Sequence, residues 1–249
     1  MRKIHIGTSG WSYKHWQDSF YHGIRKKDWL PFYARHFPSV EVNASFYRLQ
    51  SPATFLRWYE QTPEQFRFAI KANRYLTHNR KLHDPEASIM LEKSRAMMLR
   101  EKLAVVLWQL PKSWSKNLPR LQSFTQALTC WHEARHCLEF RHPSWFDAET
   151  ADCLAEAGIA VCLSDAADWP LWEQTSTDLV YLRLHGHAQT YVSCYSDQDL
   201  QRWAEKIRCW SDQVKTVYVY FDNDAQGAAP ENALTLQSLL HIAPPAAVG

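Results

Sequence analysis

Glycine is scarce in this chain, which contains 7 glycines among 249 residues, under half of the roughly 7% that is usual in proteins. The glycines are spaced so that neither G-x-G-x-x-G nor G-x-x-x-x-G-K-[ST] can be written. A Rossmann dinucleotide site and a P-loop therefore lack the turns that bring backbone N–H groups to a phosphate. The G-x-S-x-G elbow of common serine hydrolases is absent as well. The sequence thus disfavours the usual forms of nucleotide-driven chemistry.

Long apolar runs, closely paired cysteines and a large excess of one charge are also missing. No segment approaches the ~20 apolar residues that span a bilayer, and the start, MRKIHIGTSGW, is not typical of a signal peptide. The six cysteines include no C-x-x-C pair, which favours reduced thiols. The 28 Lys and Arg residues against 26 Asp and Glu predict no strong attraction to DNA or anionic lipid. We therefore expect a cytoplasmic protein with no membrane partner, and its oligomeric state stays open.

Aromatic residues, in contrast, are abundant, with 12 tryptophans, 11 tyrosines and 11 phenylalanines. Several of these rings follow predicted strands, among them Trp11, Tyr47 and Trp145. Loops after strands meet at one rim of an α/β fold, where such rings can stack on a planar ligand. Most of the other tryptophans fall on predicted helices, where packing is the better interpretation.

Short apolar segments alternate with amphipathic segments of helical length from one end of the chain to the other. The predicted strands are Lys3–Thr8, Val40–Asn43, Phe66–Lys71, Leu103–Gln109, Cys137–Arg141, Ile159–Ser164, Leu179–His185 and Thr216–Asp222. The clearest predicted helices are Trp29–His36, Ala53–Glu60, Pro85–Arg100, Leu118–Cys130, Ala148–Ala157, Asp197–Trp210 and Asn232–His241. Ser51, Asp84 and Asp147 each precede a predicted helix and are expected to cap it.

Eight alternations of this kind predict a single-domain α/β protein, a (β/α)8 TIM-type barrel over residues 3–241. The segment after the sixth strand, 165–176, is short and rich in tryptophan, so we expect an irregular connection in place of the sixth helix. Residues 242–249 are predicted to form a disordered tail.

The alternation within the strands predicts which side chains line the barrel. In Val40-Glu41-Val42-Asn43 the valines share one face and the polar residues share the other, and four further strands have the same parity. Alternate residues of a barrel strand point outward to the helices and inward to the axis. Inward polar residues near the carboxyl ends of the strands are Glu41, Asn43, Lys71, Gln109, Glu139, Arg141, Arg183, His185 and Asp222. Active sites of such barrels lie at this end, so this polar ring is the candidate site.

The residue types in the ring indicate separate roles. The predicted anion binders are Lys71, Arg141 and Arg183, because guanidinium and ammonium groups suit phosphate or carboxylate. Glu41 and Glu139 are the predicted catalytic acid–base pair, with His185 as a proton shuttle. A different interpretation is a structural network of internal salt bridges that closes the top of the barrel.

The loop after the first strand, Gly7-Thr8-Ser9-Gly10-Trp11, offers hydroxyls and backbone N–H groups to an oxyanion or a phosphate. A tight turn that leads into aromatic packing is an equal alternative. Metal signals are weaker, because His185-Gly186-His187 is not a spaced ligand motif. We predict no metal ligands and no cofactor, and a divalent metal stays open as an alternative.

Ordered motifs along the chain resemble a known family. The motifs GTSGWSYKHW, VEVNASFYRL, FAIKAN, LWQLP, LEFRHPSW, YLRLHG and VYVYFDNDAQGAAPENA resemble the YecE-like family, also called domain-of-unknown-function family 72, over about residues 3 to 240. The resemblance implies a TIM-type barrel and implies no particular activity. It marks these positions: Gly7, Ser9, Gly10, Trp11, Glu41, Asn43, Tyr47, Lys71, Gln109, Glu139, Arg141, His142, Trp145, Arg183, His185, Gly186 and Asn223. Two segments depart from the family pattern, FYHG in place of FYP and FDNDA in place of FNNTA or FNNDA, so Asp222 is not marked.

These observations predict an enzyme that acts on a polar anionic, for example phosphorylated, small molecule by acid–base chemistry, as a hydrolase, lyase or isomerase. The predicted substrate-binding residues are Ser9, Trp11, Asn43, Tyr47, Lys71, Gln109, Arg141, Trp145, Arg183 and Asn223. One alternative is a metal-dependent hydrolase of nucleic-acid phosphodiesters, similar in fold to barrel-type apurinic-site endonucleases. Another alternative is a binding protein without catalysis.

Overall fold

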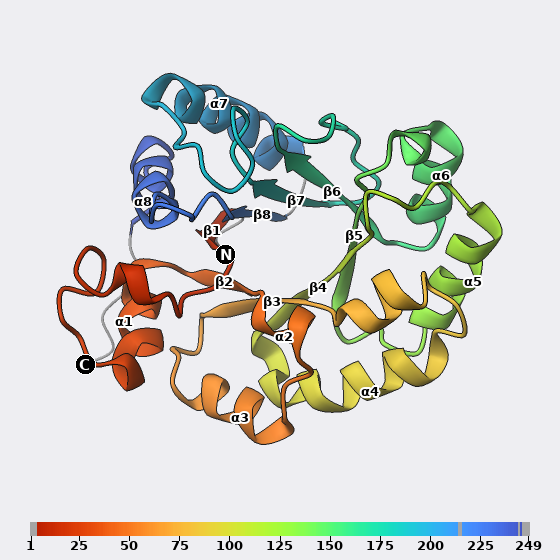
Figure 1. Cartoon of the computed structure of the whole chain (residues 1–249), viewed down its shortest axis with the longest axis horizontal. Helices are drawn as coiled ribbons and strands as arrows, with labels where there is room; N and C mark the ends of the chain where they lie inside the picture. The colour runs from red at the N-terminus through yellow and green to blue at the C-terminus, as the bar shows by residue number, and fades with distance from the viewer. Residues whose placement is uncertain (1–3, 214–215, 244, 246–249) are drawn as a thin grey trace.

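The computed structural model describes residues 4–213, 216–243 and 245, and its centre is a ring of parallel strands. The strands are β1 (Ile4–Thr8), β2 (Ser39–Val42), β3 (Arg67–Lys71), β4 (Leu103–Gln109), β5 (Arg135–Glu139), β6 (Ala160–Asp165), β7 (Leu179–Leu184) and β8 (Thr216–Phe221). Their order in the sheet is β1-β8-β7-β6-β5-β4-β3-β2, and every hydrogen-bonded pair is parallel. The helices surround these strands (Figure 1). The predicted (β/α)8 TIM-type barrel is confirmed.

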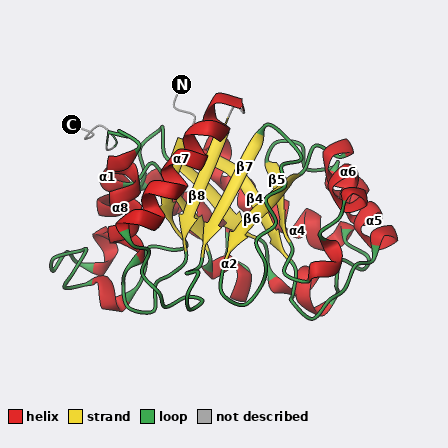
Figure 2. Cartoon of the chain, turned by 90° about the horizontal axis from the view of Figure 1, so that it is seen from above, coloured by secondary structure: helices red, strands yellow, loops and turns green. Residues whose placement is uncertain are grey.

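The α-helices of the described residues follow the strands in the expected alternation. They are α1 (Trp29–His36), α2 (Ala44–Tyr47), α3 (Pro52–Glu60), α4 (Glu86–Ala96), α5 (Leu118–Leu128), α6 (Ala148–Glu156), α7 (Asp197–Gln213) and α8 (Ala229–Leu239). Residues 166–178, between β6 and β7, contain no helix, as expected for this irregular connection. Figure 2 shows the strands between flanking helices, with the short α2 beyond one end of the strands. This end, where the strands finish, carries the polar ring.

Two of the three predicted helix caps are present. The Ser51 side chain accepts a hydrogen bond from a backbone N–H of α3, and Asp147 does the same for α6. Asp84 does not cap α4, because its carboxylate instead accepts from Arg80 Nη2 at 2.8 Å. The predicted helix Pro85–Arg100 is also shorter than expected, since the chain changes to a 3-10 helix after Ala96.

The barrel closes between β1 and β2 through few backbone contacts. Ser9 and Glu41 form an isolated bridge, and the Gly10 N–H donates to the Glu41 carbonyl at 2.7 Å. The two strands approach so closely that a Cβ on Gly7 would lie 2.0 Å from the Ser39 carbonyl oxygen. One of the few glycines is therefore required by this close approach.

A side chain completes the same seam. The Tyr33 hydroxyl, from α1, accepts a hydrogen bond from the Thr8 N–H at 2.9 Å and donates to the Ser39 carbonyl at 3.2 Å. Tyr33 is fully buried. One phenol thus links β1 to β2 in place of a continuous backbone ladder, and we call this contact the Tyr33 bridge.

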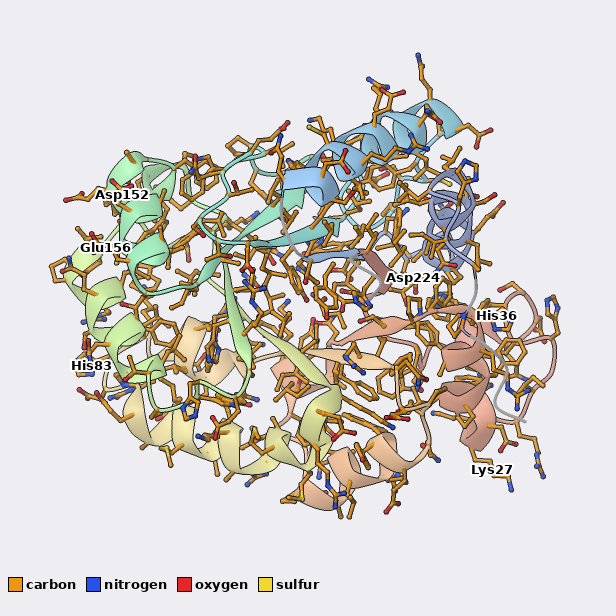
Figure 3. The ribbon with its side chains drawn as sticks, turned by 180° about the vertical axis from the view of Figure 1, so that it is seen from behind. Lys27, His36, His83, Asp152, Glu156 and Asp224 are labelled. Atoms are coloured by element: carbon orange, nitrogen blue, oxygen red, sulfur yellow. The ribbon has the colours of Figure 1, made fainter. Side chains whose placement is uncertain are left out.

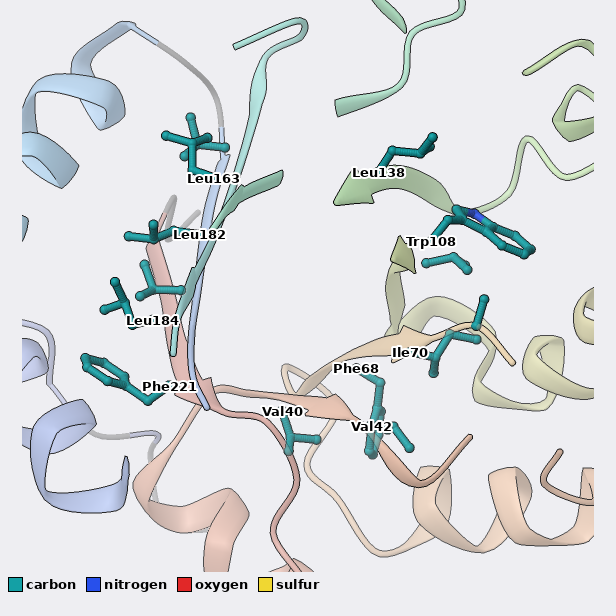
Figure 4. Packing of buried hydrophobic residues seen from close by; sticks show 14 of the residues in the cluster. Val40, Val42, Phe68, Ile70, Trp108, Leu138, Leu163, Leu182, Leu184 and Phe221 are labelled. Carbon is teal, nitrogen blue, oxygen red and sulfur yellow. The ribbon is translucent and has the colours of Figure 1, made fainter. Parts of the chain in front are cut away.

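Two sets of apolar side chains alternate along the strands, as their parity predicted. The outward set packs under the helices, and Figure 4 shows the labelled members Val40, Val42, Phe68, Ile70, Trp108, Leu138, Leu163, Leu182, Leu184 and Phe221. The inward set fills the barrel axis and comprises Ala69, Val105, Leu107, Cys137, Ala160, Cys162, Leu179, Tyr181, Tyr218 and Tyr220. The polar ring therefore has an apolar floor.

Several smaller expectations can be compared with the structure. All six cysteines are free. Among the described helices, none is both long and apolar enough to cross a membrane. Lys3, in the first predicted strand, and residues 244 and 246–249 of the predicted tail lie outside the described residues. The tail and the cytoplasmic location stay predictions.

Candidate functional site

Arg183 is the centre of the polar ring. It extends from β7 into the barrel, is fully buried, and contacts three carboxylates. Nη1 donates to Glu139 Oε2 at 2.7 Å, and Nη2 donates to Glu41 Oε1 at 2.7 Å and to Asp222 Oδ2 at 2.9 Å. Burial alone would lower the pKa of Arg183, but the carboxylates outweigh burial and raise it well above its ordinary value. Arg183 is therefore a permanent cation inside the barrel.

Glu41, at the end of β2, uses both carboxylate oxygens within the protein. Oε2 accepts from the Tyr181 hydroxyl at 2.6 Å and from Arg183 Nε at 3.0 Å. Oε1 accepts from the Ser9 hydroxyl, which itself accepts from Arg183 Nη2 at 3.0 Å. The first loop thus contributes to the ring through its serine. Glu41 is completely buried.

Glu139, at the end of β5, lies between two guanidinium groups. Its Oε2 accepts from Arg183, and its Oε1 accepts from Arg141 Nε at 2.6 Å. Burial alone would raise the pKa of Glu139, but Arg141 and Arg183 outweigh it and hold the pKa well below the usual range. Glu139 is therefore ionised at neutral pH.

His185 is neutral, and its surroundings select one tautomer. Arg183 Nη1 lies 3.1 Å from Nε2, and because arginine only donates, Nε2 accepts. The ring proton is then on Nδ1, 3.0 Å from Asp222 Oδ2. Burial and the positive charge of Arg183 lower the pKa of His185 to about 4. His185 thus presents a basic nitrogen to Arg183, and its Nδ1 lies close to Asp222 without the geometry of a hydrogen bond.

A cavity of about 300 Å³, which we call the mouth cavity, lies above the ring. Its lining residues are Tyr13, His15, Asn43, Tyr47, Lys71, Tyr191, Asp222, Asp224 and Ala225. Asp222 is the one ring carboxylate in this lining. Asp224 accepts from Trp16 Nε1 at 2.8 Å and contacts His15 Nε2 at 2.8 Å, and burial raises its pKa to about 6. The mouth cavity therefore combines acidic, basic and aromatic groups.

Lys71, at the end of β3, borders the mouth cavity without a protein partner for its charge. It is only 6% exposed, and no hydrogen bond or ion pair joins its ammonium to any other residue in the described part of the chain. Nζ lies 4.1 Å from the centre of the Phe46 ring. Burial, followed by the positive charge of Arg183, lowers the pKa of Lys71 to about 8.

Arg141, which is ion-paired with Glu139 through Nε, has one guanidinium nitrogen without an acceptor in the described part of the chain. Its Nη1 donates to the Tyr191 hydroxyl at 3.0 Å, and its guanidinium lies 4.0 Å from the centre of the Trp169 ring. Its Nη2 is buried and has no acceptor among the described residues. Tyr191 connects this guanidinium to the mouth cavity.

A larger cavity of about 740 Å³ lies beside the mouth cavity and shares Tyr13, Asn43 and Tyr47 with it. The rest of its lining is Gly10, Trp11, Ser12, Lys26, Lys27, Leu30, Ala44, Arg57, Trp58 and Gln61. Its three cations form no ion pair within the described residues. Figure 3 places Lys27 at the periphery and Asp224 nearer the barrel strands. We call this second space the basic groove.

The structure brings most of the predicted site residues together, with some exceptions. Gln109 is buried at the level of the ring and lines neither cavity. Trp145 is fully buried, and its indole N–H donates to the Trp114 carbonyl at 2.9 Å. Asn223 is also buried, and donates to Asn232 Oδ1 at 2.9 Å. Trp145 and Asn223 thus contact neither cavity.

Some residues of the site were not among the predicted site residues. Strand parity could have identified Tyr181, which lies two residues before Arg183 on β7. Parity also placed Asp222 in the ring, although the family pattern does not mark that residue. Asp224 continues the same parity beyond β8. Tyr191 has no such signal, because it reaches the site from an irregular loop.

The described residues contain no group of three or more His, Cys, Asp or Glu side chains that could hold a metal ion. The carboxylates that could serve as ligands are instead hydrogen-bonded to Arg183. This donor set does not fit a divalent metal.

Known proteins resemble this chain in sequence and in structure. The YunF protein of Bacillus subtilis (strain 168) is 28% identical over 276 aligned positions, which cover 96% of this chain and 95% of YunF. The YecE protein of Escherichia coli (strain K12) is 33% identical over 144 positions, 57% of this chain and half of YecE.

Solved structures agree with the fold. A DUF72 family protein from Thermotoga maritima MSB8 has a TM-score of 0.87 at 27% identity, over 96% of this chain and 100% of its own. A DUF72 family protein from Enterococcus faecalis V583 has a TM-score of 0.83 at 22% identity, over 99% of this chain and 100% of its own, a likeness of fold alone. The family described as "Protein of unknown function DUF72" matches residues 5–247. The chain therefore belongs to the DUF72 family.

Proposed function

We propose that this protein is an enzyme that binds a small anionic substrate in the mouth cavity and transforms it by acid–base chemistry. The observation that carries the proposal is a pair of cationic side chains, each with a nitrogen that has no acceptor within the described residues, Lys71 Nζ at the mouth cavity and the buried Arg141 Nη2. Arg141 is ion-paired with Glu139 through Nε, but a buried donor without an acceptor still costs about 1–3 kcal/mol. A carboxylate or phosphate in the cavity would supply the missing acceptors, and guanidinium suits both groups.

The positions of the acidic groups indicate a different role for each of them in this proposal. Asp222 borders the cavity and lies 3.0 Å from the protonated nitrogen of His185, so we assign proton exchange with the substrate to these two residues. Glu41 and Glu139, the acid–base pair predicted from the sequence, lie beneath them and act through Arg183. Their charge keeps Arg183 fixed and balances charge that develops on the substrate.

The basic groove supports a second candidate, a nucleic-acid ligand. Its three cations, Lys26, Lys27 and Arg57, would contact phosphates, and Trp11 and Tyr47 offer ring faces on which bases stack. The absence of a metal-ligand cluster among the described residues directs this candidate toward binding and away from metal-dependent cleavage.

Thermal unfolding in the presence of ligands tests the two candidates. Tm would be measured with inorganic phosphate, 3-phosphoglycerate, glycerol 3-phosphate and a single-stranded DNA 12-mer. A ligand at 100 times its Kd stabilises the folded state by about 2.7 kcal/mol, which raises Tm by about 5–11 °C for a chain of this length. We expect the small phosphates to raise Tm, and Lys71→Met and Arg141→Met to abolish the rise.

Lys112→Met, which changes an exposed lysine outside both cavities, is the matched control and should keep the rise. Any small anion that binds would then be examined for turnover by NMR, where Asp222→Asn should retain binding and lose turnover. Equal Tm shifts in all variants, or none in the wild type, would contradict the leading proposal. Binding of the 12-mer that weakens in Lys26→Met and steeply with salt would favour the nucleic-acid candidate.

A further inference from the structure

Lys71 has the surroundings of a reactive amine. A lysine that only holds a charge lies beside carboxylates or carbonyls, as Lys102 does: its Nζ donates to the Tyr59 and Thr62 carbonyls at 2.6 Å each. Both lysines are buried, at 6% and 4% exposure, but within the described residues Lys71 alone of the two lacks every such acceptor. Lys71 also borders the mouth cavity, whereas Lys102 lines none of the cavities described above.

We propose that Lys71 is a nucleophile that forms an imine with a substrate carrying both a carbonyl and an anionic group. This inference rests on the proposed function, because it uses the same cavity and the same anion-binding guanidinium. It adds the class of substrate, an α-keto acid or a phosphorylated aldehyde or ketone, and a covalent step.

The charged groups around Lys71 come from several elements and act on its pKa in opposite directions. Arg183 of β7 and Arg141, just after β5, oppose the ammonium, whereas Glu139 of β5 and Asp222, after β8, favour it. Phe46 of α2 covers one side. Burial, followed by the positive charge of Lys71, lowers the pKa of His78 to about 4, so this ring is neutral. Burial dominates this set and lowers the pKa of Lys71 to about 8, which leaves a large neutral fraction at mildly basic pH.

The covalent step balances without an added oxidant or reductant. The Lys71 ammonium first releases one proton to solvent, and the neutral amine then attacks the carbonyl carbon. The carbonyl electron pair moves to oxygen, which takes up a proton from the attacking nitrogen. The released proton returns to this hydroxyl, which leaves as water as the C=N bond forms, so that the ammonium and the carbonyl compound give a protonated imine and one water. The positive imine nitrogen then withdraws electrons through the imine carbon and acidifies the hydrogens on the neighbouring carbon of the substrate, where Asp222 exchanges a proton.

The anionic group of such a substrate has a place beside Lys71. Arg141 Nη2 has no acceptor among the described residues, and its neighbouring Nη1 is bonded to Tyr191, which lines the mouth cavity. A carboxylate or phosphate at Arg141 would hold the carbonyl near Nζ. This contact adds a preference for anionic carbonyl compounds to the reactivity of the neutral Lys71 amine.

Reductive trapping tests the inference. The full-length protein would be incubated with pyridoxal 5′-phosphate, an aldehyde with a phosphate group, reduced with sodium borohydride, and mapped by peptide mass spectrometry. Pyruvate and glyceraldehyde 3-phosphate, trapped with cyanoborohydride, separate the keto-acid and sugar-phosphate classes. We expect Lys71 to be modified at least tenfold faster than the exposed Lys112, with a pH profile whose midpoint lies near 8.

Matched variants make the result decisive. Lys71→Met should lose the adduct, Lys112→Met should keep it, and Arg141→Met should slow the modification of Lys71 by the anionic aldehydes but not by uncharged propanal. The inference is overturned if adducts spread evenly over surface lysines or persist in Lys71→Met. Tm shifts with the carbonyl-free phosphates separate the two proposals. If these phosphates raise Tm but no adduct forms at Lys71, the imine is overturned and the proposed anion binding is retained.

Discussion

Formal charge in the polar ring is balanced, because three carboxylates meet three cations around one neutral imidazole. Arg183 contacts Glu41, Glu139 and Asp222 at 2.7 to 2.9 Å, and all are largely or fully buried. Buried ion pairs stabilise a fold little compared with apolar packing, but removing one partner leaves an uncompensated charge. The ring is thus both a site for chemistry and a point at which single substitutions are costly.

Glu139→Gln should destabilise the folded protein by about 3–5 kcal/mol, since it removes the anion that lies between two buried guanidinium groups. The two neighbouring arginines outweigh the opposing effect of burial and hold this carboxylate ionised in the native state, so the amide cannot replace its charge. Urea denaturation at pH 7 would measure the change. Glu149→Gln is the matched control, because Glu149 pairs with Lys116 at the surface and is 65% exposed. Glu149→Gln should change the free energy of unfolding by about 0–1 kcal/mol. Equally small changes for both variants would argue against a buried network that depends on the charge of Glu139.

At the scale of elements, the seam between β1 and β2 is the least regular part of the barrel. The Tyr33 bridge supplies an acceptor for the Thr8 N–H and a donor for the Ser39 carbonyl, both of which are buried. Tyr33→Phe keeps the ring and leaves both backbone groups without a partner. We expect a loss of about 1–3 kcal/mol in the free energy of unfolding and faster hydrogen exchange at the Thr8 amide.

Tyr59→Phe serves as the comparison for this prediction. The Tyr59 hydroxyl donates to the Glu101 carboxylate at the surface, where water can replace it. Its removal should change stability by about 0.5 kcal/mol or less. If Tyr33→Phe behaves in the same way, with unchanged exchange at Thr8, the phenol is not what connects β1 to β2.

The elements also explain which features could be predicted from the sequence. Strand parity depends on a local two-residue period, so it placed Glu41, Glu139 and Arg183 inside the barrel without any knowledge of their partners. The short α2, the π-helix at Tyr75–Asn79 and the loop that brings Tyr191 to the site are different. They depend on contacts between segments far apart in the chain, for which local spacing carries no signal. Trp145 lines neither cavity for a similar reason. Its place in a loop after a strand did not reveal that its indole packs on Trp114.

At the scale of the whole molecule, buried titratable groups outside the ring make opposite contributions to acid stability. Burial lowers the pKa of His136 from 6.5 to about 4, so between these values the unfolded chain binds a proton that the folded chain does not. Stability therefore falls as pH falls through this window. Burial raises the pKa of Glu92 from 4.5 to about 7, so its contribution is fully present below 4.5 and is lost as pH rises through 7.

These two linkages oppose each other between pH 7 and pH 5, and each amounts to about 2 kcal/mol over that interval at about 1.4 kcal/mol per pKa unit. Glu92→Gln keeps an acceptor for the Asn73 N–H but removes the gain on acidification, so the variant should lose about 2 kcal/mol more than the wild type on going from pH 7 to pH 5. His136→Asn removes the loss, and the variant should lose about 2 kcal/mol less than the wild type over the same interval. Urea denaturation at both pH values measures these differences. The change in the free energy of unfolding between the two pH values isolates the titration, because a packing defect lowers stability equally at both. Parallel slopes for both variants and the wild type would show that neither group titrates inside the folded barrel as its burial requires.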